Sequence, residues 1–286
     1  MIGSCRASGY NTTVGITFMK RAFCKAAATA ALFAFSLPAF AIFQNGGFES
    51  NDFSSWTTGF GINQGLTGSQ PFNGSNINLG SGGSFRGAIL TAGPDLAGAP
   101  ITLPHVGKHT ARVNNDATGG YANFISQADA ITAADRDTGD NKLHVRFDYA
   151  VVLDNPPHTA AEQPFFFISV RDLTANTTLF EDFSFAGQTG TQFQPVGGGT
   201  SYLYLDWKHA DVVVPDASIG HTIEVYLLAS DCEQTGHAGY AYLDGFGSAI
   251  VAPTGATVPT PALNDLAMVL LGLGLLGMAG FAARRA

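Results

Sequence analysis

The sequence has few cysteines, and this limits how the chain can be cross-linked. It holds three cysteines in 286 residues, and two of them, Cys5 and Cys24, lie in an N-terminal segment that we expect to be removed. Cys232 then has no partner for an intrachain disulfide, so it is either buried and inert or open to an intermolecular bond. We favour burial, because free cysteine is among the most buried residue types.

Basic residues are also scarce. Between Ile42 and Thr257, 8 lysine and arginine residues stand against 21 aspartate and glutamate residues, a net charge of −13, whereas the whole chain carries −8. Nucleic-acid binding requires clustered lysine and arginine, so we exclude nucleic acid as a partner. An acidic field of this size suits divalent cations and a self-repelling, soluble surface.

Catalytic motifs are missing as well. The sequence has no Gly-x-Ser-x-Gly elbow, no His-Glu-x-x-His pair and no phosphate-binding glycine loop. Its seven histidines are scattered without metal-ligand spacing. We expect His105 and His109 to face solvent, and His237 to be a core histidine that bonds a neighbouring turn. The protein is therefore predicted not to be an enzyme, and an exported glycan hydrolase is the least favoured alternative.

The N-terminal region has the pattern of a secretory signal peptide. A positively charged start at Met19 precedes the apolar run 26–37 and a small-residue cleavage site that ends at Ala41. The run is about a dozen residues, too short to cross a bilayer, and its alternative is a buried core helix. We expect residues 1–41 to form the signal region, with Met19 as the true start.

A second apolar segment lies at the C-terminus. Residues 266–283 are uncharged and apolar, close to the roughly 20 residues that a membrane helix needs, and an arginine pair follows them. The arginines would stay on the cytoplasmic side by the positive-inside rule. We expect one domain over residues 42–252, a Pro/Thr linker over 253–263 and a transmembrane sorting segment over 264–286.

The order of short motif, single helix and arginine pair resembles the PEP-CTERM and IPTL-CTERM sorting signals over about the last thirty residues. Val258, Pro259 and Thr260 match the opening motif of those signals, whereas residues 261–263 depart from the IPTL form. The resemblance implies recognition and removal by an exosortase-type transpeptidase; the alternative is a plain membrane anchor. Both interpretations place the domain in the cell envelope, at the cell surface or in the extracellular matrix of a Gram-negative-type bacterium.

The domain between these segments reads as all-β. Short runs rich in β-branched and aromatic residues alternate with Gly, Asn, Asp, Ser and Pro clusters, the pattern of a β-sandwich. A long surface loop is expected over residues 63–87 and one helical turn around 130–134. The strands that we expect are 143–149, 165–170, 178–185, 202–207, 210–214, 222–229 and 238–243.

Two motifs at the ends of the domain narrow the fold. The opening segment 45–49, followed by Trp56, and the closing segment 241–246 resemble the galactose-binding-like jelly roll of carbohydrate-binding modules. The resemblance implies a jelly-roll β-sandwich in which the first and last strands meet. Phe48 and Trp56 are large enough to plug one end of it.

Related jelly rolls hold a structural calcium ion where the first and last strands meet. Carried over to this sequence, Glu49 and Asp244 are the matched ligands, and spacing adds Asp52 with carbonyls near Gly47 and Asn51. Calcium takes six to eight oxygen ligands, which carboxylates separated in sequence can supply. The alternative is that these are ordinary strand-end residues hydrogen-bonded to loops.

A sugar site needs exposed aromatic side chains beside hydrogen-bonding groups. With Trp56 assigned to the core, the candidates are Trp207, Tyr202, Tyr204 and Tyr121. We therefore predict a non-catalytic surface protein that binds or is embedded in extracellular polysaccharide. The alternative is a structural or adhesive component that contacts proteins and carries a structural calcium ion.

Overall fold

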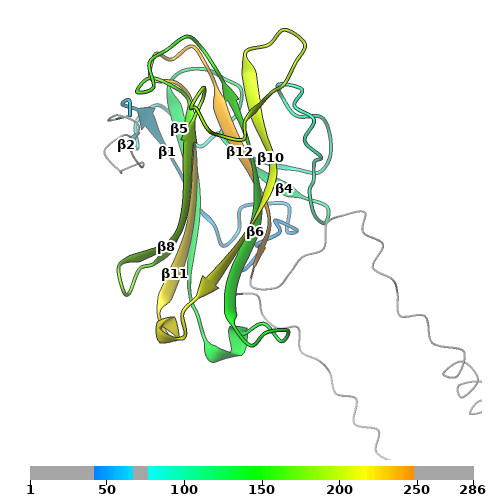
Figure 1. Cartoon of the computed structure of the whole chain (residues 1–286), viewed down its shortest axis with the longest axis vertical. Coiled ribbons are helices and arrows are strands. Elements are labelled where there is room, and N and C mark those ends of the chain that lie inside the picture. Colours follow the sequence, from blue (N-terminus) through cyan, green and yellow to red (C-terminus); the bar gives the residue numbers. More distant parts are fainter. Residues whose placement is uncertain (1–41, 67–76, 248–286) are drawn as a thin grey trace, which may run out of the picture. The chain divides into compact units, whose positions relative to one another are not determined.

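The computed structural model describes residues 42–66 and 77–247, which form two six-stranded antiparallel sheets. Sheet A has the strand order β2-β1-β5-β11-β7-β8 and sheet B has the order β3-β4-β12-β6-β10-β9. Figure 1 shows the two layers, with β8, β11 and β5 in one and β10, β6 and β4 in the other. The elements are β1 (Thr57–Asn63), β2 (Ile77–Leu79), β3 (Ala88–Leu90), β4 (Thr110–Val113), β5 (Tyr121–Ala130), η2 (Ala133–Asp135), β6 (Leu143–Asp154), β7 (Phe165–Asp172), β8 (Thr177–Phe185), β9 (Gln194–Pro195), β10 (Tyr202–Val214), η3 (Asp216–Ser218), β11 (Thr222–Ser230) and β12 (Gly239–Gly247).

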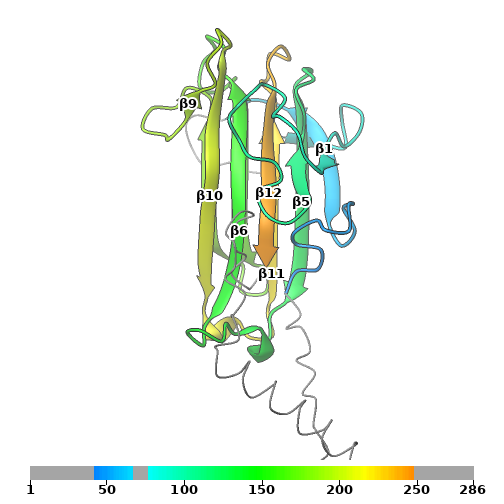
Figure 2. The same cartoon turned by 90° about the vertical axis from the view of Figure 1, so that its right-hand side faces the viewer.

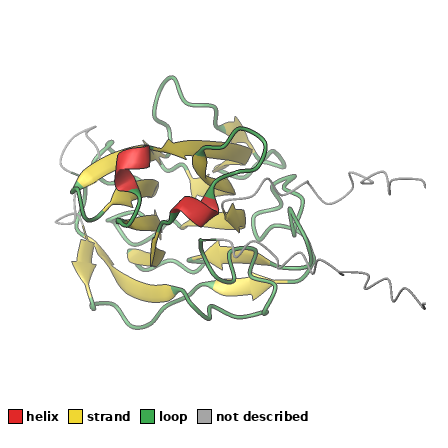
Figure 3. Cartoon of the chain, turned by 90° about the horizontal axis from the view of Figure 1, so that it is seen from below, coloured by secondary structure: helices red, strands yellow, loops and turns green. Residues whose placement is uncertain are grey.

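The two sheets lie face to face, so the predicted β-sandwich is confirmed. Seen from below, strands form both layers, and the helical structure of the described residues is limited to two short 3₁₀ turns (Figure 3). The chain passes from sheet A to sheet B between β5 and β6 and returns between β6 and β7. It crosses to sheet B again between β8 and β9, returns to sheet A between β10 and β11, and crosses once more between β11 and β12. Repeated crossing between two facing antiparallel sheets is typical of a jelly roll.

The predicted terminal segments lie outside the described residues. This applies to the signal region 1–41 and to the sorting segment 264–286. Among the residues that are described, no helix is long and apolar enough to span a membrane. Residues 67–76 of the expected loop 63–87 are likewise outside them, and β2 (Ile77–Leu79) lies in its described part.

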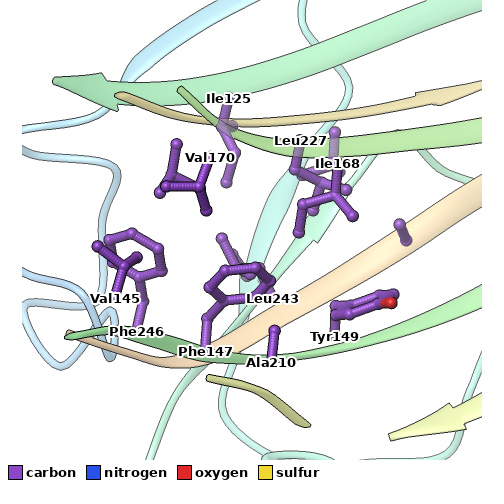
Figure 4. Packing of buried hydrophobic residues seen from close by; sticks show 14 of the residues in the cluster. Ile125, Val145, Phe147, Tyr149, Ile168, Val170, Ala210, Leu227, Leu243 and Phe246 are labelled. Atoms are coloured by element: carbon purple, nitrogen blue, oxygen red, sulfur yellow. The ribbon is translucent and has the colours of Figure 1, made fainter. Parts of the chain in front are cut away.

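The core fills the space between the sheets (Figure 4). Successive side chains of a strand point to opposite faces, so Val145, Phe147 and Tyr149 of β6 face inward. Ile168 and Val170 of β7 meet them from sheet A. All twelve residues of β6 are buried, because loops also cover the outer face of sheet B. Buried side chains therefore lie on both faces of β6.

Strand β10 contains a bulge that the sequence pattern does not predict. The two strands expected over 202–207 and 210–214 form one strand, and its register against β6 shifts between Leu205 and Lys208. Asp206 and Trp207 together oppose a single residue of β6. A bulge re-aims side chains locally, and here it turns Trp207 outward, 6.3 Å from the ring of Tyr242.

The opening segment packs against the end of β12. The ring of Trp56 stacks on Phe48 at 5.2 Å and meets the Phe246 ring at 5.3 Å, so the predicted plug is confirmed. The contact is not between paired strands, because the partners of β12 are β4 and β6 and residues before Thr57 form turns. A Cβ atom on Gly46 would lie 2.1 Å from the carbonyl oxygen of Phe246. The two ends of the domain thus meet by direct backbone approach.

The variant Gly46→Ala should be destabilised by about 1–3 kcal/mol, because its methyl group would force the opening turn away from the β12 backbone. The measurement is urea unfolding followed by tryptophan fluorescence, which reports the environment of Trp56 and Trp207.

Gly47→Ala is the matched control. A Cβ atom at Gly47 meets nothing closer than the Glu49 side chain at 3.7 Å. Its free energy of unfolding should stay within about 0.5 kcal/mol of the original protein. Equal losses in the two variants would contradict the close approach at Gly46.

Candidate functional site

The outer face of sheet B is covered by the connection between β3 and β4, which passes in front of β12 (Figure 2). Its anchor is Asp95, a buried carboxylate. Asp95 accepts hydrogen bonds from the hydroxyls of Tyr240 and Tyr242, the latter at 2.6 Å. It also accepts the backbone N–H groups of Ala97 and Ala99, both at 2.9 Å. Burial raises the pKa of both tyrosines, so they remain protonated donors.

Asp244 of β12 anchors the far end of the same connection. Its Oδ2 atom accepts the backbone N–H groups of His105 at 3.0 Å and Val106 at 2.9 Å, together with the Thr110 hydroxyl. Its Oδ1 atom accepts the N–H of Gly245 at 2.7 Å. Burial raises the pKa of Asp244 to about 6, and the surrounding donors oppose that rise.

Glu49 holds the neighbouring stretch of this connection. Its Oε1 atom accepts the backbone N–H groups of Lys108 at 2.7 Å and His109 at 3.3 Å. Glu49 and Asp244 therefore anchor one loop from opposite ends of the domain. Asp52 does not join them, because its Oδ1 atom accepts the N–H of Ser54 at 2.9 Å within its own turn. The bonds to Ser54 lower the pKa of Asp52.

These contacts do not fit the calcium ion expected from the sequence. Calcium needs lone pairs from six to eight oxygen atoms. The Oδ2 atom of Asp244 instead faces three hydrogen-bond donors, and the Oε1 atom of Glu49 faces two. Within residues 42–66 and 77–247, the group of three His, Cys, Asp or Glu side chains close enough to share a metal ion does not include Glu49, Asp52 or Asp244. The alternative role of hydrogen-bonded loop anchors describes both residues.

The expectation that His105 and His109 face solvent is wrong. The ring of His105 stacks on Trp207 with centroids 4.4 Å apart, and the His109 side chain is 14% exposed next to Glu49. Trp207 also donates its indole N–H to the carbonyl of Thr102 at 2.9 Å. The same connection therefore holds one face of Trp207.

An open groove lies beside the covered face, along β10 and the connection that leads from β8 to β10. It consists of two adjoining hollows of about 310 and 400 Å³, which share Gln192, Leu205 and Lys208. We call it the β10 groove. Side chains that line only the first hollow include Asp182, Ser184, Gln188, Thr189, Thr191 and Phe193. Those that line only the second are Gln194, Asp206 and Trp207.

The lining of the β10 groove is suited to polyhydroxylated ligands. Amide side chains such as Gln192 both donate and accept, as a sugar hydroxyl requires of its partners. Trp207 and Phe193 add aromatic surface. Lys208 is fixed by its Nζ atom, which donates to Asp182 at 2.7 Å, and the Tyr149 hydroxyl donates to the same carboxylate.

Three of the four predicted aromatic residues belong to this region. Trp207 lines the groove, and the Tyr204 hydroxyl donates to the groove residue Gln194 at 3.2 Å. Tyr202 packs on the same outer face of sheet B. Tyr121 lies in sheet A, under the guanidinium of Arg86, and is apart from the others.

Sequence reasoning missed the amide and hydroxyl residues of the groove. Apart from Ser184 of β8, they come from residues 188–194, a run rich in Gln and Thr that precedes a glycine-rich turn. Such a run resembles any polar loop, because nothing local indicates that it folds over a bulged strand.

Comparisons with known proteins identify no family for this chain. No protein-family model matches the sequence, and no curated protein matches it. Among solved structures, the fold is similar to a family 27 carbohydrate-binding module of Caldicellulosiruptor saccharolyticus in complex with mannohexaose, with 11% identity, a TM-score of 0.35 and coverage of 71% of this chain and 94% of that one. It is also similar to a cleaved adhesin domain of Lys-gingipain, with 14% identity, a TM-score of 0.33 and coverage of 71% and 96%. A third is the family 11 carbohydrate-binding module of a Clostridium thermocellum cellulase, with 8% identity, a TM-score of 0.27 and coverage of 69% and 88%.

The loop anchor at Asp244 predicts a pH dependence of stability. The folded pKa of about 6 lies above the ordinary value of 3.8, so folding favours the protonated carboxyl. This stabilisation is complete below the unfolded pKa and is lost as pH rises through the folded pKa. Between about pH 5 and about pH 7.5 the original protein should lose about 1.4 kcal/mol at this group.

Asp244→Asn should lack this loss, so its pH profile measured by urea unfolding should be flatter by that amount. The pKa of Asp231 is also raised by burial, to about 7. Because Asp231 is present in both proteins, its contribution cancels when the two pH profiles are compared.

Adding calcium to chelator-treated protein should leave the melting temperature unchanged. A calcium-dependent rise that Asp244→Asn abolishes would restore the metal site.

Proposed function

We propose that this protein is an exported, non-catalytic glycan-binding protein that holds extracellular polysaccharide in the β10 groove. The observation that carries the proposal is the groove itself. Amide, hydroxyl and charged side chains line it beside Trp207, at an edge of sheet B that the β3–β4 connection leaves open. Its two hollows are each within the range of small-molecule sites.

The shape of the groove favours a polymer over a single sugar. The hollows adjoin through Gln192, Leu205 and Lys208, and both open to solvent. A chain can therefore enter from the side and place successive sugar units along β10. Its ends need not be recognised, so internal segments of a long polysaccharide are the ligands that we expect.

The titratable groups support binding rather than hydrolysis. A glycoside hydrolase needs a carboxylic acid of raised pKa beside the scissile bond. In the described part of the chain, the carboxyl groups with raised pKa are Glu224, Asp231 and Asp244, and none of them lines the β10 groove. Asp182, which does line it, is held by Lys208 and Tyr149.

The cellular setting of the proposal comes from the sequence. We expect signal cleavage after Ala41 and recognition of the tail at Val258, Pro259 and Thr260 by an exosortase-type transpeptidase. The domain would then sit in the envelope or the surrounding matrix, where polysaccharide is available.

Substitutions in the groove should weaken polysaccharide retention. Affinity electrophoresis in gels that contain mannan, xylan or mixed-linked glucan measures it. Gln192→Ala removes a hydrogen-bonding group worth about 0.5–1.5 kcal/mol and should raise Kd about 2–10-fold. Trp207→Ala should have a larger effect, because it also removes the aromatic surface.

Gln234→Ala is the matched control, because Gln234 is an exposed glutamine outside both hollows. It should bind like the original protein. The glycan-binding proposal fails if no polysaccharide or array glycan is retained, or if Gln234→Ala loses as much affinity as Gln192→Ala.

Mass spectrometry of the protein from cell and medium fractions should test its processing. We expect an N-terminus at Ile42 in both fractions and, in the processed form, loss of the C-terminal segment 264–286. A protein that keeps residues 19–41 would contradict signal cleavage, and one that keeps the tail would indicate a plain anchor.

A further inference from the structure

Three potential metal ligands meet at the end of the sandwich where β6 ends and β12 begins. His158 lies in the β6–β7 connection, and Cys232 and His237 lie in the β11–β12 connection. One ring nitrogen of each histidine and the Sγ atom of Cys232 lie within 4.8 Å of one another. The connections are brought together by the main chain, since the N–H of Asp154 donates to the carbonyl of Ala238 at 2.9 Å.

The separation of two of these atoms matches shared coordination. Cys232 Sγ and His237 Nδ1 are 3.6 Å apart. Zinc bonds of about 2.3 Å to sulfur and about 2.0–2.1 Å to nitrogen, at a tetrahedral angle, place the two ligand atoms about 3.5 Å apart. The pair could therefore accept a metal ion with little movement.

His158 supplies an independent observation. Its Nδ1 atom is buried and has no hydrogen-bond partner. An unpaired polar atom in this position costs about 1–3 kcal/mol, so it calls for a ligand. The His158 and His237 rings lie edge to face, with centroids 4.9 Å apart and planes at 83°. Two imidazoles and one thiol therefore converge, and one of the imidazoles has a buried nitrogen that lacks a partner.

The backbone holds the ligands without help from a metal. The N–H of Cys232 donates to the carbonyl of His237 at 2.9 Å, and Thr235 turns the loop between them with a φ of 68°. The side-chain amide of Gln163 donates to the carbonyls of Pro156 and His158, which fixes the facing connection. Ligands that are positioned in advance lose little entropy on binding.

We propose that Cys232, His158 and His237 form a site for a divalent transition-metal ion of borderline softness, with zinc as the natural probe. Thiolate and imidazole suit such ions, whereas calcium and magnesium require oxygen. Three protein ligands leave a fourth position for water. On binding, the Sγ–H bond breaks, sulfur forms a bond to the metal, and the proton passes to solvent.

The charge around the cluster is consistent with a bound cation. Glu162 and Glu233 belong to the same two connections, and the N–H of Glu233 donates to the carbonyl of Glu162 at 3.0 Å. Metal binding releases the thiol proton of Cys232, and protons compete with the metal for both imidazoles. Affinity should therefore fall as pH is lowered.

The test uses the purified protein, stripped with chelator and titrated with cobalt and then zinc. We expect one cobalt ion per chain and a sulfur-to-cobalt charge-transfer absorption that zinc abolishes. Zinc at about one hundred times its Kd should raise the melting temperature by roughly 5–10 °C.

Cys232→Ser, His158→Gln and His237→Gln should each weaken cobalt binding at least tenfold, and Cys232→Ser should remove the charge-transfer absorption. Because Cys232 is fully buried, the two histidine variants keep the test valid if the serine variant does not fold. His221→Gln is the control, since His221 bonds Asp172 outside the cluster. The site is excluded if the original protein shows no charge-transfer absorption, or if both histidine variants bind cobalt as the control does.

Discussion

Buried carboxylates that accept hydrogen bonds from loops are the interaction on which this sandwich depends. Asp95 and Asp244 hold the two ends of the β3–β4 connection against sheet B. Asp231 accepts the N–H groups of Tyr121 and Gly239 together with an amide of Asn114, which ties β12 to β5. A buried charge without such donors would be costly, so each loop and its acceptor must become ordered together. Part of the acidity of the domain therefore comes from buried aspartates that hold its loops.

The position of the candidate site follows from this covering. The loop that Asp95 and Asp244 hold down covers the aromatic side chains of β12, and the β10 groove lies beside it. The bulge at Asp206 and Trp207 then turns the indole toward that open side, where His105 and Thr102 hold one flank of it. The β10 groove therefore has Trp207 on one side, placed by the β10 bulge and held by the anchored β3–β4 connection.

Sequence reasoning predicted the strands whose inward residues are apolar and failed where packing overrides that pattern. Strand β6 was found because Val145, Phe147 and their neighbours alternate in the sequence. Strand β5 was missed because its buried positions include the polar residues Asn123 and Gln127, whose side chains donate to Asn114 and to the carbonyl of Gln44. The motifs at Glu49 and Asp244 did indicate that the two ends of the domain meet. They could not indicate the donors that face these carboxylates, since those come from a third segment.

The same limit explains why the Cys232 cluster has no sequence signature. His158 lies 74 residues before Cys232, and metal motifs are recognised only when their ligands share a turn or a helix. In a β-sandwich the ligands are instead set side by side by strand pairing, here by Gly239 of β12 opposite Leu153 of β6. Because Asp231 and strand pairing already order both connections, the fold does not require a metal as a zinc finger does. A metal ion would act as a cross-link between two ordered loops, in a domain whose described residues contain a free cysteine and no second one to pair with it.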